Sequence, residues 1–216
     1  MFEIDKYLDS LPDNVDVINV SYKDLDYLPN LSRFKKLKCL YCDHNKLTSL
    51  PVLPENLKML KCSDNKLTSL LPILPENLKF LYCYNNNLTS LPVLPKNLKE
   101  LCCFYNKLTS LPVLSENLEK LDCSNNKLTS FSVLPQKLKA LYCYGNPIDK
   151  LIYNNNPSML NKNIIILNNF RHLFYCLKYR KIFLKMMEPI IKKRYHPSYL
   201  YDLKEDDDLD KKLDGW

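Results

Sequence analysis

The sequence predicts an α/β repeat solenoid, and three observations support this prediction. One template of twenty residues recurs along the chain, its copies are almost evenly spaced, and its apolar positions stay the same. The template reads L-x-x-L-x-C-x-x-N-x-L-T-S-L-P-V-L-x-x-N, and its seven copies begin at Val15, Leu37, Leu57, Leu78, Leu98, Leu118 and Leu138. Successive copies begin 22, 20, 21, 20, 20 and 20 residues apart. A near-constant period of this length indicates stacked units that each pack only against their neighbours.

Residues 1–14 are expected to form an N-terminal cap. Their apolar side chains have the spacing of one side of a short helix that ends before Pro12: Phe2, Ile4, Tyr7, Leu8 and Leu11. Such a cap would cover the exposed edge of the first strand. The first repeat is degenerate, with Val20 at the Cys position and Lys23 at the Asn position, as terminal repeats often are.

Residues 15–150 form the predicted repeat array, with one short strand in each unit. Because side chains alternate along a strand, the Leu at position four and the Cys at position six should face the core together. Six cysteines share that position and would act there as small hydrophobic residues: Cys42, Cys62, Cys83, Cys103, Cys123 and Cys143. The Asn at position nine is expected to satisfy buried backbone groups at the turn after the strand.

The return segment of each repeat is expected to be extended and to contain little or no helix. It is short and has one or two prolines in most copies, and proline opposes the interior of a helix. Leu71 is an additional residue in the third repeat, and we expect a bulge on the convex side to accommodate it.

The template resembles the leucine-rich-repeat family, with Cys in place of Leu at position six. Its Leu-Pro-x-Leu-Pro ending, as in Leu50 to Pro54 and Leu91 to Pro95, is similar to the short LPX subclass known from secreted bacterial effectors. The resemblance covers residues 11–150. It implies a horseshoe with a parallel, concave β-sheet and a mostly extended convex side, closed by helical caps at both ends. It implies little about function, because one fold hosts many functions.

Residues 151–203 are expected to form a helical C-terminal cap, and residues 204–216 a charged, disordered tail. Within 163–188, apolar residues recur with the spacing of an amphipathic helix: Ile166, Phe170, Leu173, Leu177, Leu184 and Met187. The stretch Lys178 to Lys181, together with Tyr195 to Leu200, resembles the C-terminal ends of uncharacterised proteins of mimivirus-like giant DNA viruses. That resemblance implies a viral protein made inside an infected cell.

The outward strand positions three, five and seven vary between repeats and should line the concave face. Several are aromatic, and large exposed aromatic patches are typical of binding surfaces. The sequence therefore predicts a protein–protein interaction module whose partner contacts these residues: Tyr41, Asp43, Met59, Lys61, Phe80, Tyr82, Tyr84, Glu100, Phe104, Lys120, Asp122, Tyr142 and Tyr144. The alternative interpretation is that neighbouring rings only stack on each other along the sheet.

Two other functions stay open. Residues 162–194 have a net charge of +8, within a chain of net charge +7, and could bind single-stranded nucleic acid together with the concave aromatic residues. An adaptor is the second alternative, in which the concave face selects a target and the C-terminal helices dock onto a host assembly. Neither the identity of the partner nor the oligomeric state follows from the sequence.

Catalysis, a metal site and a cofactor are not expected. The chain has only two glycines and therefore no glycine-rich phosphate loop, and its three histidines stand apart without a nucleophile beside them. Cys39-x-x-Cys42 lacks a second pair at zinc-site spacing, and Cys62-Ser63-Asp64, which matches the ligase motif of some LPX effectors, lies inside a repeat. The sequence contains no recognisable membrane-spanning segment or signal peptide. An intracellular location, in the host cytoplasm, is therefore expected.

Overall fold

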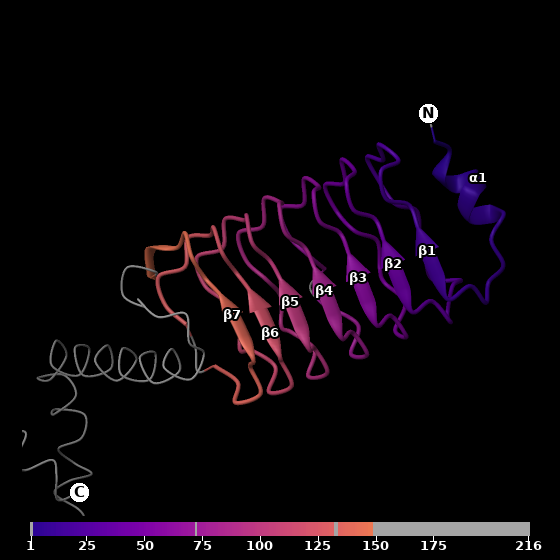
Figure 1. The fold of residues 1–216 in the computed structure, drawn as a ribbon. Helices are drawn as coiled ribbons and strands as arrows, with labels where there is room; N and C mark the ends of the chain where they lie inside the picture. Colours follow the sequence, from indigo (N-terminus) through magenta and orange to yellow (C-terminus); the bar gives the residue numbers. More distant parts are fainter. Residues whose placement is uncertain (1, 72, 132–133, 149–216) are drawn as a thin grey trace, which may run out of the picture. The chain divides into compact units, whose positions relative to one another are not determined.

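The computed structural model describes residues 2–71, 73–131 and 134–148. Each of the seven repeats contributes one three-residue strand, and the strands form a single parallel sheet in chain order (Figure 1). The strands are β1 (Val17–Asn19), β2 (Cys39–Tyr41), β3 (Met59–Lys61), β4 (Phe80–Tyr82), β5 (Glu100–Cys102), β6 (Lys120–Asp122) and β7 (Ala140–Tyr142). The predicted solenoid is confirmed.

The core consists of residues at equivalent positions of the repeats, stacked on each other. The pairing aligns Ile18 with Leu40, Leu40 with Leu60, and so on to Leu141, one rung per repeat. The Leu and Cys side chains at positions four and six of the middle repeats have no exposed surface. One repeat could not bury these residues alone, so the core is stabilised by the stacking of neighbours.

The position-nine asparagines form the expected ladder. Asn86 is typical: its Nδ2 donates to the carbonyl oxygens of Cys62 (3.0 Å), Cys83 (3.2 Å) and Tyr84 (3.1 Å), and its Oδ1 accepts the N–H of Leu67 at 2.9 Å. Each such amide therefore satisfies backbone groups of its own repeat and of the preceding one.

A second ladder of asparagines precedes the strands, and we did not anticipate it from the sequence. In each case Nδ2 donates to a backbone carbonyl of the preceding repeat at 2.8–3.1 Å; the donors are Asn56, Asn77, Asn97 and Asn117. The signal was present in the template, which ends on this Asn in four copies. In the next copy, Lys137 takes the same position and its Nζ donates to Asn117 Oδ1 at 2.7 Å.

The N-terminal helix α1 (Ile4–Asp9) lies beyond the β1 edge of the sheet and buries Ile4 and Leu8 (Figure 1). Arg33 of the first repeat connects to this segment: its guanidinium donates to Asp13 at 2.7 Å and to the carbonyl of Leu8. The helix is shorter than the apolar spacing suggested, and its function as a cap stays a prediction. The expected C-terminal helix, cap and tail lie outside the described residues.

The return segments are extended, as predicted. Among the described residues, none of the segments between successive strands forms an α-helix, and one isolated parallel bridge joins Ile73 to Val93. The additional residue of the third repeat lies in such a segment, between the buried side chains of Leu70 and Leu74, and the pairing of β3 with β4 is undisturbed. Leu71 helps to line a shallow hollow of about 620 Å³ there, together with Val52 and Ile73.

Candidate functional site

The concave sheet face, defined by positions three, five and seven of each repeat, is the candidate binding surface. Parallel pairing without a slip places equivalent positions side by side, so the face has three rows that cross the strands. All thirteen residues predicted to bind a partner belong to these rows. Eleven of them are half-buried by their neighbours, while Tyr142 and Tyr144 are 47% and 55% exposed.

A connected group of polar and aromatic side chains lies across the middle of this face. The Lys61 ammonium lies 5.2 Å from the ring centroid of Tyr41 and 5.4 Å from that of Tyr82, within the range of a cation–π contact. The Tyr82 hydroxyl donates to Glu100 Oε2 at 2.9 Å. Burial and this carboxylate raise the pKa of Tyr82 well above its usual value, so the phenol keeps its proton and acts as a donor.

The two central rings stack on each other rather than standing free. Tyr84 and Phe104 lie 4.3 Å apart with 6° between their planes. For this pair the stacking interpretation is correct, because residues in neighbouring strands are close enough to stack directly. The rings of Tyr142 and Tyr144, by contrast, are exposed to solvent.

Asp43 occupies position seven of the second repeat and is half-buried. Its Oδ1 accepts the N–H of Ser63 at 3.0 Å. Burial raises the pKa of Asp43 above its ordinary value, although the Ser63 N–H and the nearby Lys61 oppose this shift. This carboxyl is therefore held in the sheet face at an electrostatic cost.

Three side chains expected to face outward are buried instead. Ser63, Cys102 and Ser124 are at most 6% exposed, although they occupy the same rows. They are short, and longer side chains of adjacent strands flank them, so solvent does not reach them. These three side chains belong to the outward rows, as expected from their positions, but they are not exposed to solvent.

The remaining predicted residues lie in register with one another. In the backbone register, Glu100 of β5 lies opposite Lys120 of β6, and Asp122 of β6 lies opposite Tyr142 of β7. Asp122 Oδ1 also accepts the N–H of Ser124 at 3.1 Å, which limits its rotation. The C-terminal half of the face therefore contains both signs of charge beside exposed aromatic rings.

A further row at the rim of the face was missed by sequence reasoning. Position eight of every repeat has positive φ, between 50° and 69°: Tyr22, His44, Asp64, Asn85, Tyr105, Asn125 and Gly145. Most of these residue types tolerate the left-handed conformation, so the pattern was available in the sequence. Tyr22 stacks on His44 at 4.2 Å, and His44 Nε2 lies 3.3 Å from Asp64 Oδ2. Tyr22 and Tyr105 are 73% and 56% exposed and extend the aromatic surface.

The buried thiols are poor nucleophiles. Burial raises the pKa of Cys102 to about 11. Burial also raises the pKa values of five ladder cysteines well above their usual value: Cys42, Cys62, Cys83, Cys103 and Cys123. Within the part of the chain that the structure describes, no group of three or more His, Cys, Asp or Glu side chains could hold a metal ion. No helix among these residues is long and apolar enough to cross a membrane.

Comparisons with known proteins agree with this geometry. A model described as leucine-rich repeats in two copies matches residues 76–116 and 96–136. No curated protein matches the chain. Among solved structures, YopM from Yersinia enterocolitica WA-314 is 38% identical, with a TM-score of 0.61, over 63% of this chain and 30% of that one. A Shigella effector LRR domain is 32% identical, with a TM-score of 0.59, over 66% of this chain and 63% of that one.

YopM from Yersinia pestis is 34% identical, with a TM-score of 0.58, over 61% of this chain and 37% of that one. The chain thus spans less than two thirds of the length of each of these structures. Because the sequence model and the structural neighbours agree on the same repeating unit, the described repeat array has the fold of leucine-rich-repeat proteins.

Proposed function

We propose that the concave sheet face binds a protein partner. The observation that supports this most directly is the exposure of aromatic rings on the face: Tyr142 and Tyr144 of the seventh repeat are about half exposed, and the Tyr84–Phe104 stack lies in the fourth and fifth repeats. Tyrosine and other aromatic residues supply much of the energy of protein–protein contacts. The constant core positions would build the scaffold, and the variable outward positions would select the partner.

The proposal assigns an interaction role and no catalytic step. Two of the similar structures are YopM proteins and one is an effector LRR domain, and those descriptions apply to those proteins. They support the use of this fold as a recognition surface. A viral origin, an intracellular location and a place in the host cytoplasm are further parts of the proposal, which rest on the resemblance of the C-terminal sequence.

The test is a tagged pull-down from host-cell cytosol that compares the wild-type chain with the Tyr82→Ser, Tyr84→Ser, Phe104→Ser triple variant. We expect at least one protein to be lost from the variant, because it loses the central aromatic contacts. Proteins and nucleic acids in each eluate are identified separately. Thermal unfolding of the variant must remain cooperative, so that a loss of binding is not a loss of folding.

The matched control is the Val52→Ser, Val93→Ser, Val113→Ser variant, which removes apolar surface from the return segments, where these side chains are 73–84% exposed. Its captured proteins should equal those of the wild type. Identical captures from all three baits would contradict the proposal and favour an adaptor that uses residues 163–203. Loss of a nuclease-sensitive RNA alone would favour the nucleic-acid alternative.

A further inference from the structure

Four lysines form an uninterrupted row along one edge of the concave sheet face. They occupy position two of consecutive repeats, directly before the strands, and are Lys38, Lys58, Lys79 and Lys99, here called the lysine row. Backbone bonds join each to the next: the N–H of Lys58 donates to the carbonyl of Lys38 at 2.7 Å, and those of Lys79 and Lys99 continue the series at 2.8 Å. The row therefore repeats at the strand spacing of about 4.8 Å.

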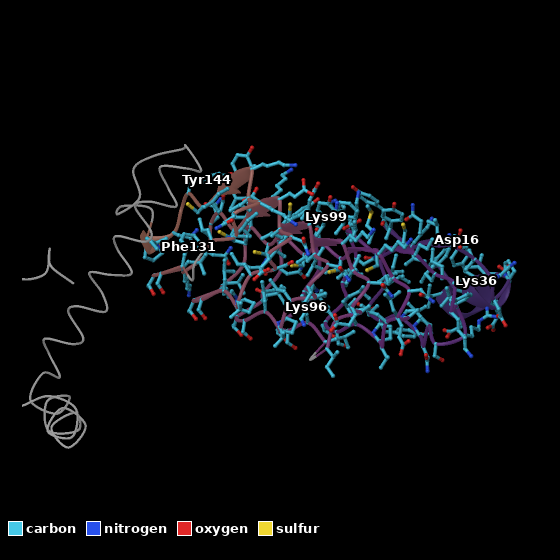
Figure 2. All side chains as sticks on the ribbon, turned by 90° about the horizontal axis from the view of Figure 1, so that it is seen from below. Asp16, Lys36, Lys96, Lys99, Phe131 and Tyr144 are labelled. Carbon is cyan, nitrogen blue, oxygen red and sulfur yellow. The ribbon has the colours of Figure 1, made fainter. Side chains whose placement is uncertain are left out.

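Acidic side chains end the lysine row but do not neutralise its middle. Lys38 pairs with Asp16 at 2.8 Å, and Lys99 lies 3.4 Å from Glu119, which also pairs with Lys139. Neither Lys58 nor Lys79 has an ion pair among the described residues. Figure 2 shows Lys99 on the same side of the array as Tyr144, with Lys96 on the opposite side. Like charges at adjacent strand positions repel each other unless an anion is shared between them.

An apolar row adjoins the lysine row. Position three of β2, β3 and β4 holds Cys39, Met59 and Phe80, each half-buried and therefore partly accessible. Over these three strands, neither position two nor position three contains a carboxylate. A cationic line and an apolar line thus run side by side across the strands.

We infer that the partner presents an acidic amphipathic α-helix that lies across β2 to β4, with its carboxylates on the lysine row and its apolar side on Cys39, Met59 and Phe80. Side chains three and four residues apart on a helix recur about every 4.5–6 Å along its axis, which matches the spacing of about 4.8 Å between strands. Helices commonly dock in grooves through such rows. The inference rests on the proposed function and names the partner class for the same face.

The contacts within the face favour a helix over single-stranded nucleic acid. Base stacking requires free ring faces, but Lys61 lies over both Tyr41 and Tyr82, and Tyr84 stacks on Phe104. The row beside the lysines contains a thiol, a thioether and one ring, which can accommodate aliphatic side chains better than a series of bases.

The test uses a synthetic, fluorescein-labelled peptide of about 18 residues, with Glu in one helical row and Leu in the adjacent row. A scrambled isomer of the same composition is the control ligand. Fluorescence anisotropy gives Kd for the wild-type chain, for Lys58→Gln/Lys79→Gln and for Lys66→Gln/Lys107→Gln, a control with the same change of charge at position ten. We expect the patterned peptide to bind more tightly than its isomer, and the first variant to bind roughly three- to tenfold more weakly than the wild type.

The control variant should bind within about twofold of the wild type, and added salt should weaken the wild-type complex more than that of Lys58→Gln/Lys79→Gln. Equal affinities for the two peptides, equal losses in the two variants, or absence of peptide binding would overturn the inference. So would an oligouridylate that binds more tightly than the peptide with the same dependence on Lys58 and Lys79. The pull-down separates the two proposals. If Lys58→Gln/Lys79→Gln still captures the proteins that the Tyr82→Ser, Tyr84→Ser, Phe104→Ser variant loses, the proposed function stands and the inference of an acidic helix is refuted.

Discussion

At the scale of single residues, Asp43 shows how the concave face differs from an ordinary protein surface. Its carboxyl is half-buried in the row at position seven, where it accepts the N–H of Ser63. The loss of hydration outweighs the favourable bond and the nearby Lys61, and the pKa of Asp43 is raised. A charge held at such a cost in a surface row is consistent with a role in recognition.

Replacing Asp43 by Asn should therefore stabilise the protein at neutral pH. A carboxyl whose pKa is raised in the folded state binds protons more tightly there than in the unfolded chain, so ionisation lowers the free energy of unfolding as pH rises above 3.8. The Asn oxygen can still accept the Ser63 N–H. Urea unfolding at about pH 7 and about pH 3 should show the variant more stable at the higher pH and equal to the wild type at the lower one. If the stability gained by Asp43→Asn increased as the pH is lowered, the raised pKa of Asp43 would not be the cause.

At the scale of the repeat element, the two asparagine ladders connect one turn to the next. The ladder after the strand is buried, whereas the ladder before it is exposed to solvent. In both, a side-chain amide takes the place of the regular backbone bonds that a helix or a longer strand would supply. Short strands of three residues are therefore sufficient to hold repeats together.

The buried ladder should contribute far more to stability than the exposed one. Asn86→Ala removes the acceptor of the Leu67 N–H and a donor to three carbonyls, so we expect the free energy of unfolding to fall by about 2–4 kcal/mol. Asn77→Ala, the control, removes one exposed bond to the Glu55 carbonyl and should cost less than about 1 kcal/mol. Chemical unfolding measures both values. Similar losses for the two variants would show that burial does not distinguish the ladders.

At the scale of the whole molecule, the array is nearly one-dimensional. Among the residues that the structure describes, every strand pairs only with the strands before and after it in the chain, and the order is uninterrupted from β1 to β7. Such arrays are stabilised by the sum of repeat and neighbour terms, and the concave face is as long as the number of repeats allows. The lysine row and the aromatic rings both exist only because this stacking keeps one register.

Deletion of residues 98–117, one complete repeat, should leave a folded array. The deletion joins Asn97 to Leu118, which preserves the template, so β4 can pair with β6 in the register that β5 occupied. We expect cooperative urea unfolding with an m-value lower by roughly one seventh, since m scales with the surface exposed on unfolding. Deletion of residues 98–107, half a repeat, is the control and should abolish the cooperative transition. Loss of cooperativity in both variants would contradict independent stacking.

The sequence by itself determined the period, the place of each strand and the residues that face the core. Equivalent residues of a solenoid must meet in space, so a repeated Leu, Cys or Asn predicts its own ladder without knowledge of any other contact. The prolines predicted that the return segments are extended, and the period of the template predicted the place of the additional Leu71. The asparagines before the strands and the left-handed position eight were equally periodic and could have been recognised.

Only the tertiary structure decided how the outward side chains share the concave face. Three features depend on the rotamers of side chains that lie about twenty positions apart in the sequence. Lys61 lies over Tyr41 and Tyr82, Tyr84 stacks on Phe104, and Ser63 is buried. These positions differ from repeat to repeat, so no ladder rule applies to them. The lengths of a side chain and of its two neighbours on adjacent strands determine which of its atoms reach solvent. These contacts form only when the strands are paired in the sheet.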